Sequence, residues 1–251
     1  MNFDARRSIQ TPMGTPTSLP RSLEPEWLDH LPADDPRAMR SRRDLTRVNS
    51  FMGNAGRMAD TLLHHSEGKA PHTIVDLGSG DGQFMLQVAR RLAPHWRDVS
   101  VVLLDQQNIV SPATRAGFTT LGWRVDPTSA DVFDFLAQVQ PVDIITANLF
   151  LHHFVDEQLR RLFEQIARAT SLMVACEPRR SKFVVEASRL LWAVGCNDVS
   201  VHDAVASARA GFNDKELSAL WPRDPEWQVN EQTAGLFSHR FVARRNRQIS
   251  R

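Results

Sequence analysis

Short apolar runs alternate with helical stretches along most of the chain. Apolar residues recur at three- and four-residue spacing between Leu45 and Leu63, which predicts an amphipathic lid helix over 41–65, broken or kinked near Gly53 and Gly56. Further along, apolar runs predict strands at residues 73–77, 99–104, 123–125, 142–147 and 172–176. Helical spacing follows these runs at residues 84–92, 110–121, 131–139, 156–169 and 183–194.

This order of elements predicts an α/β fold. Strands without polar alternation are typical of a parallel sheet covered by helices on both faces, and repeated strand–helix units favour a doubly wound, Rossmann-like arrangement. The last two apolar runs, 227–229 and 236–242, are joined by a short Thr-Ala-Gly turn. Because a parallel connection needs a crossover, this pair is expected to be antiparallel.

The N-terminal segment differs from the rest. Residues 1–40 are rich in proline, and residues 1–22 have no apolar period. We therefore expect a partly disordered segment over 1–40, followed by one domain over 41–251.

Composition narrows the possible functions. Thirty basic residues against 29 acidic ones give a net charge of +1, which argues against a dedicated nucleic-acid partner. No apolar run suggests membrane insertion, and only Cys176 and Cys196 are cysteines, which favours a cytoplasmic protein. The sequence has no spaced His/Cys set, so no metal site is expected. Because there is no tyrosine and lysine is scarce, histidines and carboxylates are the candidate bases.

A glycine-rich loop, Val75-Asp-Leu-Gly-Ser-Gly-Asp-Gly82, follows the first strand of the sheet. Open α/β sheets bind ligands at this position. Gln83 stands where the dinucleotide fingerprint requires glycine, and no Gly-Lys-Ser/Thr of a phosphate-binding loop follows. Asp76 would repel a pyrophosphate but would attract a cationic amino acid moiety.

Two further acids follow the next strands. Asp105 can accept hydrogen bonds from both hydroxyls of a ribose, and Asp131 can accept one from an exocyclic amine or simply cap the following helix. An adenosine that carries an amino acid and no phosphate suits all three acids. That ligand is S-adenosylmethionine (SAM).

On these motifs, residues 40–243 resemble the class I SAM-dependent methyltransferases. The resemblance also includes Ser129-Ala-Asp-Val132 and Asp143-Ile-Ile-Thr-Ala-Asn148. It implies a seven-stranded, mostly parallel sheet with an antiparallel last strand, and SAM as the cofactor. The residues it implies for cofactor binding are Asp76, Gly78, Ser79, Gly80, Asp105, Gln106, Asp131, Val132 and Asn148.

Candidate catalytic residues follow the fourth and fifth strands. Leu151-His152-His153-Phe154 resembles a segment of the ubiquinone-biosynthesis methyltransferases, and either histidine is a candidate base or a packed loop residue. Glu177 is a candidate base or hydrogen-bond acceptor for substrate. His202 is a third candidate base, unless its neighbour Asp203 only caps a helix.

The resulting hypothesis is a SAM-dependent methyltransferase of secondary metabolism. Its acceptor would be a small aromatic or polyketide-like molecule, methylated on oxygen. Asn148-Leu-Phe-Leu stands in place of the Asn-Pro-Pro-Tyr of many nitrogen methyltransferases, which disfavours nucleic-acid and protein acceptors. Carbon methylation of a quinone precursor and a non-catalytic SAM-binding partner protein remain alternatives, and a homodimer is left open.

Overall fold

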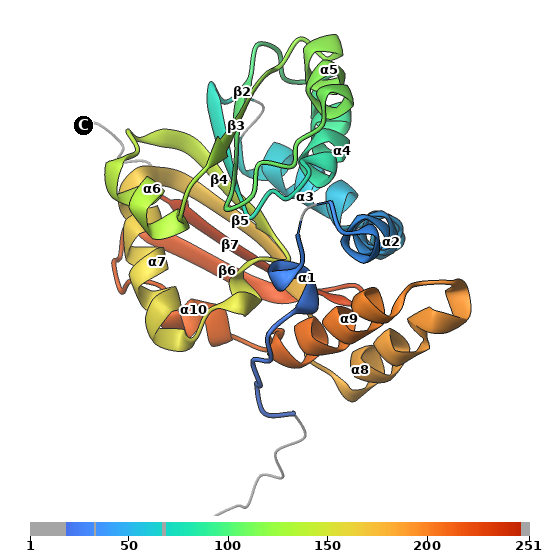
Figure 1. The fold of residues 1–251 in the computed structure, drawn as a ribbon. Helices are drawn as coiled ribbons and strands as arrows, with labels where there is room; N and C mark the ends of the chain where they lie inside the picture. Colours follow the sequence, from blue (N-terminus) through green and yellow to red (C-terminus); the bar gives the residue numbers. More distant parts are fainter. Residues whose placement is uncertain (1–18, 33, 67–68, 247–251) are drawn as a thin grey trace, which may run out of the picture.

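The structure, a computed structural model, describes residues 19–32, 34–66 and 69–246 (Figure 1). Residues 1–18 of the segment 1–40, which is expected to be partly disordered, lie outside the described residues. None of the described helices is both long enough and apolar enough to span a bilayer.

A seven-stranded sheet forms the centre of the molecule, in the order β3-β2-β1-β4-β5-β7-β6. Its strands are β1 (Thr73–Leu77), β2 (Ser100–Asp105), β3 (Arg124–Ser129), β4 (Val142–Asn148), β5 (Thr170–Pro178), β6 (Trp227–Ala234) and β7 (Ser238–Arg245). The first five strands are parallel, and β7 runs antiparallel to both β5 and β6. The predicted fold class is confirmed. The order of strands reverses between β1 and β4, and this is where such sheets open a ligand crevice.

Helices cover both faces of the sheet (Figure 1). One face packs against α3 (Asn54–His65), α4 (Gln83–Leu92) and α5 (Pro112–Thr120), and the other against α6 (Val132–Gln138), α7 (Asp156–Ala169) and α10 (Glu216–Leu220). Successive strand residues point to opposite faces: Ile74 belongs to the first hydrophobic cluster and Val75 to the second. Both faces are apolar, so the strands lack polar alternation.

The N-terminal helical region is divided differently from the expectation. Helix α2 (Pro36–Met52) ends at Gly53, whose φ of +70° lets it cap α2 and start α3. The predicted interruption is therefore a complete break. Helix α2 also begins at Pro36, inside the N-terminal segment 1–40 that was expected to precede the domain. It starts there because the Asp35 side chain accepts a hydrogen bond from the Arg37 N–H and because Pro36 suits the first helical position.

Several elements went unpredicted or extend beyond their predicted bounds. The predicted helix over 183–194 divides into α8 (Lys182–Arg189) and the 3₁₀ turn η2 (Leu190–Val194). Helix α9 (Asp198–Ala210) packs against α8, α2 and the short helix α1 (Trp27–His30), as Figure 1 shows. Its alanines and serines give little apolar periodicity. Strand β3 continues past its predicted end to Ser129, because its edge position tolerates Pro127 and exposed side chains.

Candidate active site

Two adjoining cavities, of about 240 and 380 Å³, lie where β1, β2 and β4 end. Both are lined by Gly78, Asp105 and Leu149 from these strand ends, and by Glu26 from the N-terminal segment. The first extends to Asp76, Ser79 and Asn148, and the second to Gln106, Asp131 and Val132. All the residues expected to bind cofactor thus line these two cavities.

The glycine loop has room for a side chain at Gly80 but not at Gly78. Gly78 has a φ of +66°, and a Cβ there would lie 2.2 Å from Cδ2 of Phe150. Gly80 has a φ of +55°, and a Cβ there would meet nothing within 4 Å. The N–H of Gly80 donates to Oδ2 of Asp105 over 2.8 Å, which ties the loop to the end of β2. The ring of Phe150 thus occupies the space beside Gly78, whereas Gly80 faces the open space of the first cavity.

Two buried polar atoms on the first cavity have no hydrogen-bond partner among the described residues. They are Oγ of Ser79 and Oδ1 of Asn49, which belong to the glycine loop and to α2. Unpaired buried polar atoms are rare in folded proteins. Their position on a cavity fits a polar ligand, such as the amino acid end of SAM.

Asp76 is buried at the bottom of the first cavity. Burial raises its pKa to about 7, with a further increase from nearby Asp105, although Thr146 donates a hydrogen bond to it over 2.7 Å. A buried carboxyl with this pKa becomes ionised once a cation lies beside it. The site therefore suits an ammonium group.

The acids after β2 and β3 are partly occupied by local contacts. Asp105 accepts hydrogen bonds from the N–H groups of Gly80 and Gln107, the second over 2.9 Å. Asp131 caps α6, since its Oδ1 accepts from the N–H of Phe133 over 2.8 Å. The cap interpretation of Asp131 is thus correct, and its cavity position leaves the adenine interpretation open as well, because a carboxylate has a second oxygen.

The turn after β4 is strained. Leu149 has a φ of +53°, unusual for a residue with a branched side chain, and lines both cavities. Just before it, Oδ1 of Asn148 accepts a hydrogen bond from Nδ2 of Asn54 at the start of α3, over 3.1 Å. This contact joins the N-terminal helices to the end of the sheet.

His152 lies between two carboxylates. Its Nδ1 pairs with Oε2 of Glu177 over 2.8 Å and its Nε2 with Oε1 of Glu26 over 3.3 Å. Burial disfavours the charged ring, but the hydrogen bonds to Glu177 and Glu26 outweigh it and raise the pKa of His152 to about 9. The ring is therefore protonated at neutral pH.

Glu177 is fully buried behind His152 and lines neither cavity. Its Oε1 accepts hydrogen bonds from the N–H groups of Phe150 and Leu151, over 3.1 and 2.9 Å. Glu177 thus holds the 3₁₀ turn η1 (Leu151–His153) and orients His152.

The other two candidate histidines lie in different surroundings. His153 lines the second cavity, and its Nδ1 is 3.6 Å from Oδ2 of Asp29. Burial lowers the pKa of His153, and the charge of His152 lowers it further. His202 lines neither cavity: its ring stacks on Trp27 at 4.0 Å, and its Nδ1 pairs with Oδ1 of Asp203 over 2.9 Å.

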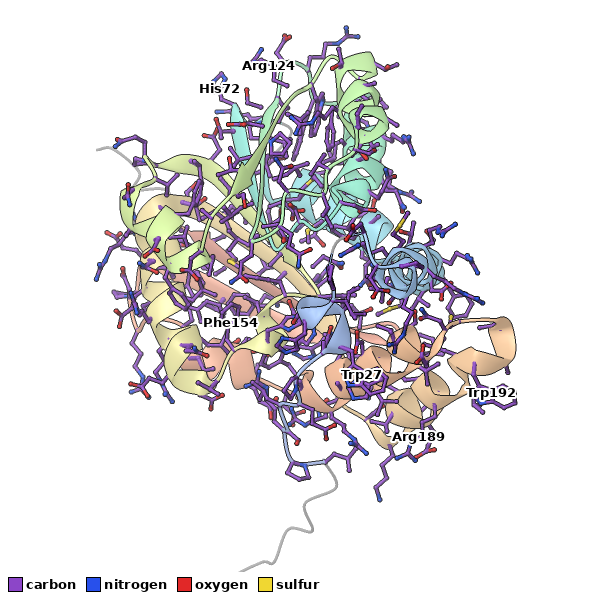
Figure 2. The ribbon with its side chains drawn as sticks, in the orientation of Figure 1. Trp27, His72, Arg124, Phe154, Arg189 and Trp192 are labelled. Atoms are coloured by element: carbon purple, nitrogen blue, oxygen red, sulfur yellow. The ribbon has the colours of Figure 1, made fainter. Side chains whose placement is uncertain are left out.

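Sequence reasoning missed the contribution of the N-terminal segment. Asp203 of α9 accepts hydrogen bonds from the N–H groups of Trp27 and Leu28, over 2.8 and 3.0 Å, and Figure 2 shows Trp27 directed towards α9. Arg21 donates to the carbonyl oxygen of Phe154 over 2.8 Å. These contacts hold α1 over the strand ends and bring Glu26 to both cavities. The only local signal was a tryptophan flanked by acids within a proline-rich stretch.

Helix α2 brings one arginine to the first cavity. Arg42 lines this cavity and reaches Oε1 of Gln107 over 3.4 Å. Arg47 of the same helix is 67% exposed and lies 3.4 Å from Asp44.

Glu26, His152 and His153 bring potential metal-ligand atoms within 4.8 Å of one another, the one such group among the described residues. Both ring nitrogens of His152 already pair with carboxylates. A metal ion at this position would have to displace at least one of these pairs.

Comparisons with known proteins agree with this geometry. Residues 74–171, from β1 to the start of β5, match the family model described as "Methyltransferase domain". The chain therefore contains a class I SAM-dependent methyltransferase domain. The protein is a SAM-dependent methyltransferase whose cofactor is SAM. No curated protein sequence matches the chain.

Solved structures share the fold at low sequence identity. The plantazolicin methyltransferase BpumL, in complex with SAH, is 16% identical with a TM-score of 0.59, over 85% of this chain and 92% of that one. The mitomycin 7-O-methyltransferase MmcR is 21% identical with a TM-score of 0.58, over 88% of this chain and 60% of that one. An O-methyltransferase family protein from Burkholderia thailandensis is 19% identical with a TM-score of 0.52, over 85% and 61%.

Proposed function

We propose that the protein methylates a hydroxyl oxygen of a small aromatic or polyketide-like metabolite. The observation that carries this proposal is His153, a histidine with a lowered pKa on the wall of the second cavity, beside Asp29. Methylation of a hydroxyl needs a group that removes its proton, and a neutral histidine does so at physiological pH.

The cofactor-binding residues divide by chemistry. SAM supplies a methyl group activated by its sulfonium. Asp76 offers a buried carboxylate for the ammonium group, and Asp105 offers acceptors for the ribose hydroxyls. Asp131 and Val132, with Gln106, line the second cavity, where the adenine is expected. Asn148 and the loop of Gly78, Ser79 and Gly80 would bind the methionine portion.

The histidines divide the remaining work. His153 accepts the hydroxyl proton, and Asp29 stabilises the resulting imidazolium. His152 is already protonated and is held on both sides by Glu26 and Glu177, so it positions the turn rather than acting as the base. Helix α1 contributes Leu28 and Asp29 to the walls of both cavities, which reduces the access of water to the acceptor.

The structural neighbours support an oxygen acceptor of natural-product type. MmcR is named for 7-O-methylation of mitomycin, and the Burkholderia thailandensis protein is described as an O-methyltransferase family member. BpumL is named for plantazolicin.

The test has two stages. Titration calorimetry should first show binding of SAM and S-adenosylhomocysteine. Transfer of a labelled methyl group to a panel of phenols and quinols should then yield methyl ethers, identified by mass spectrometry. Methylation at ring carbon would point to the quinone-precursor alternative. Tight cofactor binding without turnover across the panel would contradict the proposal and favour a non-catalytic SAM-binding protein.

A further inference from the structure

We propose that Glu26 selects the acceptor by binding a positively charged amine carried by the same molecule whose hydroxyl is methylated. The inference rests on the proposed function and adds to it the acceptor's chemical class, an amine-bearing phenol or related hydroxy compound. It assigns to the N-terminal segment a direct part in substrate specificity.

Glu26 has one oxygen held by the protein and one left for a ligand. Its Oε1 receives both described contacts, from Nε2 of His152 and from the hydroxyl of Ser207. No hydrogen bond within the described part of the chain engages Oε2. Because Glu26 lines both cavities, this oxygen is placed for a donor that enters them.

The charges around Glu26 leave a negative excess. Glu26, His152 and Glu177 place one positive ring between two carboxylates. Asp29 lines both cavities beside Glu26, whereas Arg21, the cation that acts on Glu177, lines neither. Although burial opposes ionisation of Glu26, its hydrogen bonds to His152 and Ser207 lower its pKa to about 2. A carboxylate in such a cavity prefers a charged donor to a neutral one, because charge-assisted hydrogen bonds are the stronger ones.

The cofactor does not neutralise the negative charge of Glu26. Asp76 and Asp105 lie at the glycine loop and serve the ammonium and ribose groups, and Asp131 lies on the side of the adenine. Asp29 lies beside His153, where it compensates the proton that His153 accepts. Glu26 holds His152 through Oε1, and its Oε2 has no group to bind in the proposed reaction.

The carboxylate is also preorganised. Glu26 is the N-cap residue of α1, which Asp203 anchors through the N–H groups of Trp27 and Leu28. Ser207 and His152 then fix the direction of the side chain. Little conformational entropy remains to be lost when a cation binds, so the contact can contribute fully to discrimination between acceptors.

The experiment uses the full chain saturated with S-adenosylhomocysteine and three phenols of similar size: tyramine, which is cationic, 4-ethylphenol, which is neutral, and 3-(4-hydroxyphenyl)propionate, which is anionic. Titration calorimetry should show tyramine binding at least about tenfold more tightly than 4-ethylphenol, as one charge-assisted contact provides. The anionic phenol should bind most weakly. In Glu26→Gln the difference between the first two phenols should shrink to about threefold or less.

Two variants serve as controls. Glu24→Gln removes an exposed carboxylate of the same segment, paired with Arg209, and should keep the wild-type preference. Glu26→Asp retains the charge and should keep the preference for tyramine. Unchanged affinity for S-adenosylhomocysteine in each variant establishes that the site is folded.

Equal binding of tyramine and 4-ethylphenol to the wild type, or binding of neither, overturns the inference whatever the variants do. An undiminished preference in a folded Glu26→Gln variant also overturns it. Methylation of 4-ethylphenol without a charge preference leaves the proposed function intact and removes only this inference. Cation-selective binding with no methyl transfer from SAM to any phenol removes the proposed function instead.

Discussion

At the residue scale, the buried carboxyl of Asp76 shows how the site is prepared for a cation at the expense of stability. Burial raises its pKa to about 7, well above the ordinary aspartate value of 3.8. Between these two values the unfolded chain releases a proton that the folded chain keeps. Stability therefore falls as the pH rises through this window, and the full penalty is present above pH 7.

Replacing Asp76 by asparagine should remove that penalty. We expect Asp76→Asn, measured by urea denaturation without cofactor, to be more stable than the wild type at pH 8 by as much as about 4 kcal/mol, and nearly equal at pH 4. The asparagine oxygen can still accept from Thr146. Calorimetry should show weaker SAM binding, because the ammonium loses its counter-charge. A stability difference independent of pH would contradict this account.

His153 and His202 can be separated as candidate bases by kinetics. His153→Gln should lower kcat by about a hundredfold or more, because a general base is lost. His202→Gln should leave the chemical step intact, since its ring stacks on Trp27 outside both cavities. Because the pKa of His153 is lowered, the wild-type rate should be constant around pH 7 and fall only below the ordinary histidine value of 6.5. An unchanged kcat in His153→Gln would remove it from catalysis.

At the scale of single elements, the glycine loop connects backbone conformation to ligand space. Gly78, Gly80 and Gly122 all have positive φ, but their surroundings differ. A side chain at Gly78 would strike Phe150, whereas Gly80 and Gly122 have open space. Only Gly80 of this open pair lines the cavity.

Alanine substitutions at the three glycines should separate the cost of the left-handed backbone from the cost of a steric clash. Each substitution costs about 1–2 kcal/mol for the left-handed conformation. Gly78→Ala should cost about 1–3 kcal/mol more, because Phe150 must move. Gly80→Ala should have the same free energy of unfolding as Gly122→Ala, a control that lies away from the cavities. Gly80→Ala should, however, bind SAM more weakly than Gly122→Ala. Equal unfolding free energies for Gly78→Ala and Gly122→Ala would show that the Phe150 side chain moves aside at no cost in stability.

At the scale of the whole molecule, the active site is formed by segments far apart in the sequence. The contact between Glu26 and His152 joins residues 126 positions apart, and that between Trp27 and Asp203 spans 176. Asp203 is almost fully buried, and its two oxygens cap the start of α1. Loss of this cap should loosen α1 without unfolding the sheet.

Hydrogen exchange can test that coupling. In Asp203→Asn, the amides of Trp27 and Leu28 should exchange about tenfold faster or more, because a charge-assisted hydrogen bond is lost. Amides of β1 and β4 should be unchanged. Asp198→Asn, in the same helix but exposed and paired with Arg37, is the matched control. Unchanged exchange at Trp27 in Asp203→Asn would show that other contacts hold α1.

The sequence by itself determined the sheet, the glycine loop and the acids at the strand ends. These features depend on local periodicity and on one rule of topology, that parallel strands end at the same edge, so Asp76, Asp105 and Asn148 had to converge. Weak periodicity left α9 unpredicted and ended the predicted β3 before Ser129. The tertiary structure alone decided the surroundings of the histidines and the place of Glu26. Protonation of His152 depends on burial and on carboxylates from β5 and the N-terminal segment, and His202 faces away from the cavities. Such properties arise from long-range contacts, which no local pattern contains.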